Sequence, residues 1–163
     1  MGAVTYPNAE VEQFLSERFV ALKFNLKDPH PDFKEALGRG KLLWAPLFIF
    51  LDGRGNELRR YVGFLPPDEF LAELTLVLGL HAMTHSQMED ALRLFDESAE
   101  RYPKASAAPE ALFWGAAAAY RIDGLAAVVQ RWDDLIARYP ESTWARRADV
   151  VPDEVRAKLA EGG

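Results

Sequence analysis

An apolar run that follows a proline and ends at a tight turn constrains the fold of this chain more than any other feature. Leu47–Leu51 reads LFIFL and is apolar on both alternating faces, which is typical of a strand covered on two sides. The letters DGRG that come next are a hairpin signal, and the more polar Glu57–Val62 reads as the returning strand. Pro46 has no N–H to donate, and the first residue of a strand tolerates that loss. The sequence therefore predicts a hairpin over residues 46–62.

The segments around the hairpin predict an α/β module. Ala9–Phe19 carries apolar residues at helical spacing, whereas Val20–Leu26 (VALKFNL) alternates apolar and more polar residues, as a strand with one wetter face does. A short helix is expected over residues 31–38, and another over residues 66–78. We expect a mixed sheet of about three strands with flanking helices.

After Gly79 the chain becomes alanine-rich and shows no further strand signal. Helices are expected over residues 86–101, 109–122 and 125–138, and Pro152 opens a last one. RYPKAS (101–106) and RYPEST (138–143) recur 37 residues apart, and helix pairs of about this length are typical of tetratricopeptide-like stacking. The chain is thus divided into an α/β domain, 1–79, and an all-α domain, 80–163. The aromatic residues expected in the helical core are Phe95, Phe113, Trp114, Trp132 and Trp144.

Charge and composition exclude several classes of function. A net charge of −6 argues against nucleic acid or an anionic membrane as a partner, because both require a basic surface. No apolar run approaches the ~20 residues of a membrane-spanning helix. The start MGAVTYPNAE has no secretory signal, so a cytoplasmic location is expected for the chain as given, and the compartment stays open if the natural N-terminus lies upstream. There is no cysteine, which excludes disulfides and cysteine nucleophiles within these residues.

Several stretches together carry a resemblance to a known family. APLFIFLD around Pro46 looks like the strand that a cis-proline precedes in thioredoxin-like proteins, and GNELRRYVGFLPPDEFLAEL is similar to their closing hairpin and last helix. AVTYPNAEVEQFLSERFVALKFNL is similar to the segment after the CxxC motif in bacterial members of the thiol–disulfide interchange type. APEALFWGAAAAY and RYPESTWARRA resemble the helical extension that some of them carry. The resemblance implies a truncated thioredoxin-like fold with tetratricopeptide-like helices after it.

The chain departs from this family where the redox chemistry would lie. The strand and the CxxC that precede AVTYP in the family are missing, and dithiol exchange needs two thiols, one of them with a lowered pKa. Without the missing strand, its two neighbours lose hydrogen-bond partners. They would pair directly with each other, which we favour, or exchange strands with a second copy through the open sheet edge, or belong to a longer polypeptide.

Two candidate sites are expected from the sequence. The resemblance implies a peptide groove in which a cis Pro46 presents the backbone of Ala45, with Trp44, Tyr6 and Phe64 nearby; ordinary packing of these aromatic residues is the alternative. No cofactor is expected. A weak metal candidate is the set His81, His85 and Glu89, spaced four apart; a solvated linker face is the favoured explanation of this spacing.

Besides metal binding, which rests only on the histidine spacing, two functions remain open from the sequence alone. The first is a redox-inactive module that binds a protein or peptide client. The second is the C-terminal portion of a thiol–disulfide oxidoreductase whose CxxC lies upstream of Met1. In neither case do these residues carry dithiol chemistry themselves.

Overall fold

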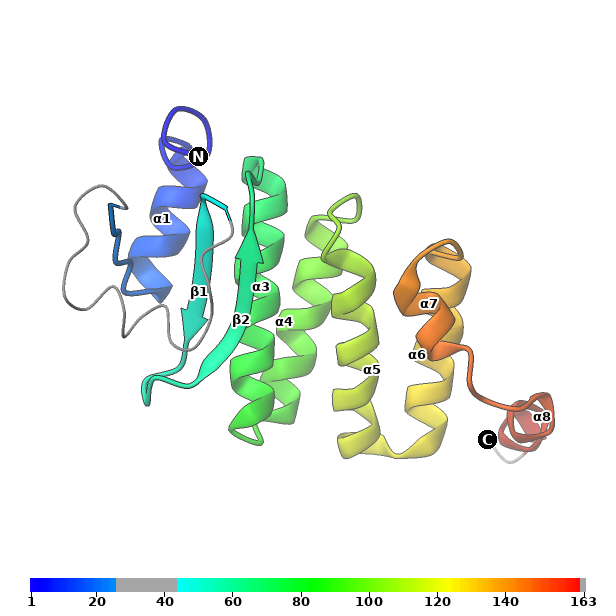
Figure 1. The fold of residues 1–163 in the computed structure, drawn as a ribbon. Helices are drawn as coiled ribbons and strands as arrows, with labels where there is room; N and C mark the ends of the chain where they lie inside the picture. Colours follow the sequence, from blue (N-terminus) through cyan, green and yellow to red (C-terminus); the bar gives the residue numbers. More distant parts are fainter. Residues whose placement is uncertain (26–43, 162–163) are drawn as a thin grey trace. The chain divides into compact units, whose positions relative to one another are not determined.

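The computed structural model describes residues 1–25 and 44–161, which hold seven helices and a two-stranded sheet (Figure 1). The chain divides into two compact units, Met1–Leu71 and Ala72–Gly163. Helix α3 (Pro67–Thr84) belongs to both units and continues through Gly79, where the sequence had suggested a domain boundary.

The predicted hairpin is confirmed. Strands β1 (Leu47–Leu51) and β2 (Glu57–Val62) pair antiparallel, with Leu47 opposite Val62 and Phe50 opposite Arg59. The carboxylate of Asp52 stabilises the turn, because its Oδ1 accepts hydrogen bonds from the backbone N–H of Arg54 and of Asn56, both at 2.8 Å. The turn thus closes on its own side chain, as aspartate at a turn commonly does.

Aromatic rings pack one face of the hairpin. Phe48 lies 5.2 Å from Phe70 at the start of α3, measured between ring centroids, and Phe50 lies 6.2 Å from Phe19. Phe19 in turn stacks at 6.4 Å on Phe14 of helix α1 (Ala9–Arg18). Phe48 and Phe50 share a face because side chains two apart on a strand point the same way. These rings form the core of the first unit.

The predicted three-stranded mixed sheet is wrong: over residues 1–25 and 44–161 the only sheet is the antiparallel pair β1–β2. Val20–Phe24 is not a strand, and Asn25 alone makes a bridge pairing. Val20 is 92% exposed and Leu22 76% exposed, so the alternation of apolar residues does not bury one face. A strand is stable only beside partners for its backbone groups, and alternation alone does not supply them. The helix predicted over 31–38, and with it the crossover to β1, lies outside the described residues.

The second unit is helical, and successive helices from α3 to α6 run in opposite directions (Figure 1). After α3 come α4 (Met88–Arg101), α5 (Ala108–Asp123), α6 (Leu125–Arg138), α7 (Thr143–Ala148) and α8 (Asp153–Glu161) (Figure 1). Helices α4, α5 and α6 were expected from the sequence, and their bounds agree with the prediction to within one or two residues. Helix α7 was not expected. Its start is fixed by Ser142, whose Oγ accepts from the N–H of Ala145 at 2.9 Å.

The 37-residue spacing in the sequence recurs in the backbone. Tyr102 and Tyr139 end α4 and α6 with nearly the same dihedral angles, φ −126° and ψ 57° against φ −135° and ψ 56°. In each turn the backbone N–H three residues after the tyrosine donates to the tyrosine carbonyl. The donor is Ala105 in the first turn, at 3.0 Å, and Ser142 in the second, at 2.9 Å. The arginine of each RYP stretch also lies over its tyrosine ring, at 5.6 and 5.5 Å. The two RYP turns are therefore the same structural element.

Phe95 of α4 occupies the centre of this unit and is fully buried. A Cβ added at Gly79 of α3 would lie 2.6 Å from Cε1 of the Phe95 ring, and one added at Gly115 of α5 would lie 3.3 Å from its Cβ. Two helices thus approach Phe95 where they carry no side chain. This close approach explains why α3 tolerates a glycine in its interior.

The other predicted core aromatics form one cluster between α5, α6 and α7. Phe113 stacks on Trp132 at 5.6 Å and lies 5.1 Å from Trp144, and Trp114 is 6.2 Å from Trp144. Each of these rings keeps some exposed surface, in contrast to the fully buried Phe95.

Replacing Gly79 by alanine is expected to destabilise the protein. An alanine in an exposed helix interior gains up to about 1 kcal/mol over glycine, but here the added methyl group overlaps the Phe95 ring, and overpacking costs about 1–3 kcal/mol. Thermal unfolding measured by circular dichroism reports the change. In the matched background Phe95→Leu the same substitution should cost less, because the ring has gone. A Gly79→Ala protein that unfolds at a higher temperature than wild type would contradict this packing.

Candidate functional site

Hydrogen bonds bring the predicted groove residues to one end of the hairpin. The N–H of Gly63 donates to the carbonyl of Pro46 at 2.9 Å, which sets Phe64 directly after this contact. The hydroxyl of Thr5, itself fully buried, donates to the carbonyl of Leu65 at 2.6 Å. The N-terminal turn that carries Tyr6 is therefore held beside the segment after β2.

Three aromatic side chains in this region are exposed, and we call Tyr6, Trp44 and Phe64 the aromatic patch. Trp44 is 71% exposed, Phe64 50% and Tyr6 36%. Val4 and Val62, close to them in the chain, are also exposed. Large apolar residues gathered on a surface mark interaction sites more often than apolar residues scattered singly do.

The patch is anchored in the core of the first unit through Tyr6. Its ring meets that of Phe70 edge to face at 6.1 Å, and Phe70 packs on Phe48 of β1. Partial burial raises the pKa of the Tyr6 phenol above its ordinary value. The patch therefore combines a fixed ring at its base with two more exposed rings.

The peptide bond between Ala45 and Pro46 is cis, the isomer that the family resemblance implies. Ala45 itself is exposed, and the carbonyl of Pro46 is engaged by Gly63. The hydrogen bond from Gly63 therefore places the residue before Phe64 beside Pro46, in a sheet smaller than expected.

The weak metal candidate does not lie on one helix face. Helix α3 ends at Thr84, and Ser86 has a left-handed φ of 59°, so Glu89 belongs to the next helix. His81 and His85 do lie together, with ring centroids 4.3 Å apart, and Nδ1 of His85 lies 2.9 Å from the carbonyl of His81. Among the residues that the structure describes, no group of three or more possible ligands is placed to hold a metal ion.

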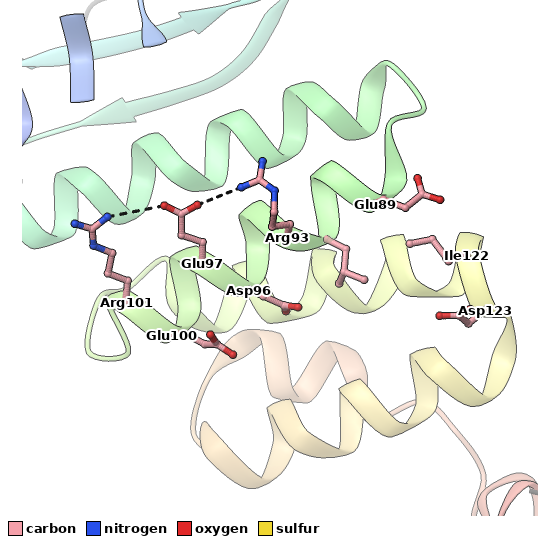
Figure 2. Close-up of a pocket in the computed structure, with 9 residues that line it drawn as sticks. Glu89, Arg93, Asp96, Glu97, Glu100, Arg101, Ile122 and Asp123 are labelled. Atoms are coloured by element: carbon pink, nitrogen blue, oxygen red, sulfur yellow. Dashed lines mark ion pairs between the residues drawn. The ribbon is translucent and has the colours of Figure 1, made fainter. Parts of the chain in front are cut away.

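A shallow hollow of about 840 Å³ lies along α4 and the end of α5, and the sequence did not indicate it (Figure 2). The apolar part of its lining comes from Leu92 and Ile122. The charged residues that line it are Glu89, Asp96, Glu97, Glu100 and Asp123 with Arg93 and Arg101. Figure 2 shows the carboxylate of Glu97 between the two arginines, at 3.6 and 3.9 Å. The excess of carboxylates gives the hollow a negative surface, which does not suit an anionic ligand.

One cross-helix ion pair beside the hollow has no signal in the sequence. Arg131 of α6 binds Asp96 of α4 through two hydrogen bonds, at 2.8 and 3.1 Å. The Arg93–Glu97–Arg101 spacing is visible in the sequence as an i, i+4 pattern, whereas the pair Asp96–Arg131 depends on how the repeats stack. The hydroxyl of Tyr139 joins the two RYP turns in a similar way, donating to the carbonyl of Pro103 at 2.8 Å.

Within the described residues, no helix is both long and apolar enough to cross a membrane. Searches against family models, curated proteins and solved structures gave no match to this chain. The resemblance to thioredoxin-like proteins therefore stays a prediction, and function has to be inferred from the residues themselves.

Proposed function

We propose that this chain is a redox-inactive protein-interaction module that binds an extended segment of a client protein at the aromatic patch. The observation that carries the proposal is the gathering of Tyr6, Trp44 and Phe64, all exposed, at the end of the hairpin where Pro46 lies. Tyrosine and tryptophan are enriched among the residues that dominate binding energies, because each offers a large and rigid contact surface.

The patch suits a chain segment more than a small molecule. An extended peptide presents side chains alternately to either side, so one or two apolar residues of the client would pack against Trp44 and Phe64. Ala45, which is exposed and adjoins Trp44 in the chain, is available to the client's main chain. The absence of cysteine means that binding leads to no thiol exchange on this chain.

The second function left open by the sequence concerns a longer natural protein. If a CxxC were encoded upstream of Met1, the same patch would present a substrate to it. The coding DNA decides this point. An in-frame segment that encodes an apolar strand and then a CxxC would replace our proposal by an oxidoreductase, and its absence would remove that alternative.

Removing two of the three rings of the aromatic patch should weaken peptide binding. We expect the immobilised full chain to select short apolar peptides from a random display library, and the double variant Trp44→Ser/Phe64→Ser to bind the selected peptides at least about tenfold more weakly. Fluorescence polarisation with a labelled selected peptide measures the affinity. The matched control is Tyr120→Ser/Leu125→Ser, which removes two apolar residues of comparable exposure, 52% and 50%, in the second unit. Equal losses in both variants, or no selection at all, would contradict the proposal.

The chain should show no disulfide-reductase activity. In the insulin assay with dithiothreitol, the rate with the protein should equal the rate of the reagent alone, because no thiol is present to form a mixed disulfide. Turnover clearly above the reagent blank, at protein concentrations where a thioredoxin control is active, would show this expectation to be wrong.

A further inference from the structure

The 37-residue period of the helical unit continues beyond α6. At this offset Ala145 and Ala148 of α7 correspond to Ala108 and Ala111 of α5, and all four side chains are buried. The turn that precedes α7 also matches the turn that precedes α5, as the hydrogen bonds of Ala105 and Ser142 show. Helix α7 therefore starts a further copy of α5.

This copy breaks after two turns. Pro152 stands where α5 has Gly115 in its interior, and α5 runs uninterrupted past that glycine to Asp123. In an unbroken helix the carbonyl of Ala148 would accept from the N–H of residue 152, which proline lacks. The carbonyl accepts instead from the N–H of Val150 at 2.8 Å, and α8 begins at Asp153. Figure 1 shows α8 turned away from the direction in which α5 and α6 run.

The residues of α8 also differ from those of α5 where α5 is most tightly packed. Arg156 corresponds to Ala119, which is 1% exposed. In α8 the arginine side chain is 23% exposed and lies among carboxylates, with Nε 2.9 Å from Oδ1 of Asp133 on α6. It also lies 3.7 Å from Asp149 and 3.6 Å from Asp153, and it donates to the carbonyl of Val151. Arg156 thus connects α8 to α6 and to the segment between α7 and α8.

Apolar side chains also pack where the end of the chain meets α5 and α6. Val151 and Leu159 pack against a buried cluster of Ala116, Val128 and Val129 on α5 and α6. Trp132 packs there too, and its indole Nε1 is buried without a hydrogen-bond partner. In a stack of repeats an end face of this kind is covered by the next pair of helices, and the last repeat needs a cap.

We propose that residues 145–161 are a copy of α5 that Pro152 breaks in two. The break lets α8 cover the apolar end of the stack at α5 and α6 as a cap, and Arg156 holds it there through its ion pair with Asp133. The cap supplies the cover that a further repeat would otherwise give. It also keeps Val128 and Val129 away from solvent.

The role of Arg156 in holding α8 is tested by amide hydrogen exchange on the full chain. Arg156→Gln should speed exchange in α8 by roughly tenfold, because a charged side chain with several hydrogen bonds is lost. The matched control is Lys158→Gln on the same helix, where an exposed cation is removed. Equal exchange of α8 in the two variants would overturn the role of Arg156.

The break is tested by Pro152→Ala. With the missing N–H restored, we expect helical 13Cα shifts and slowed amide exchange over residues 149–152, which make α7 and α8 one helix. Residues 149–152 that stay non-helical in this variant would overturn the role of Pro152. Val150→Ala, which removes a β-branched side chain in the same segment but keeps the proline, is the control and should leave the break in place.

Discussion

The packing of the second unit depends on the space that two glycines leave for Phe95. Because neither Gly79 nor Gly115 has a side chain, α3 and α5 both approach Phe95 on α4 closely. One repeat further, Trp132 stands at the position of Phe95 and Ala116 at that of Gly79, and both belong to the cluster that α8 covers.

The first unit is stabilised differently, because rings rather than helix interfaces fill its core. One face of a two-stranded hairpin is packed by Phe70 and Phe19, and a hairpin this small needs such cover to be stable. Tyr6 extends this core to the surface, where Trp44 and Phe64 are exposed. The proposed interaction function rests on that continuity: a rigid core holds the base of the aromatic patch, so binding a client does not have to order it first.

Helices with strong local signals could be predicted from the sequence, whereas elements that depend on distant partners could not. Asn8, Pro109 and Gly124 mark helix ends through their own chemistry, and the helices beside them appear where expected. The strand predicted over Val20–Leu26 had the right alternation but is not formed over Val20–Phe24, because alternation does not supply a neighbouring strand. For the candidate site, the resemblance placed Tyr6 and Phe64 near Pro46 as an expectation, but the hydrogen bonds from Thr5 to Leu65 and from Gly63 to Pro46 were not foreseeable.

The sequence by itself determined the hairpin, the helices α4, α5 and α6, the 37-residue period and the absence of thiol chemistry in these residues, since each depends on residues close in the chain or on composition. Only the tertiary structure decided that Gly79 lies against the Phe95 ring, that Asp96 and Arg131 form an ion pair, and that Arg156 joins α8 to α6. These contacts link residues far apart in sequence. Their formation depends on how whole helices pack against one another, which no local pattern encodes.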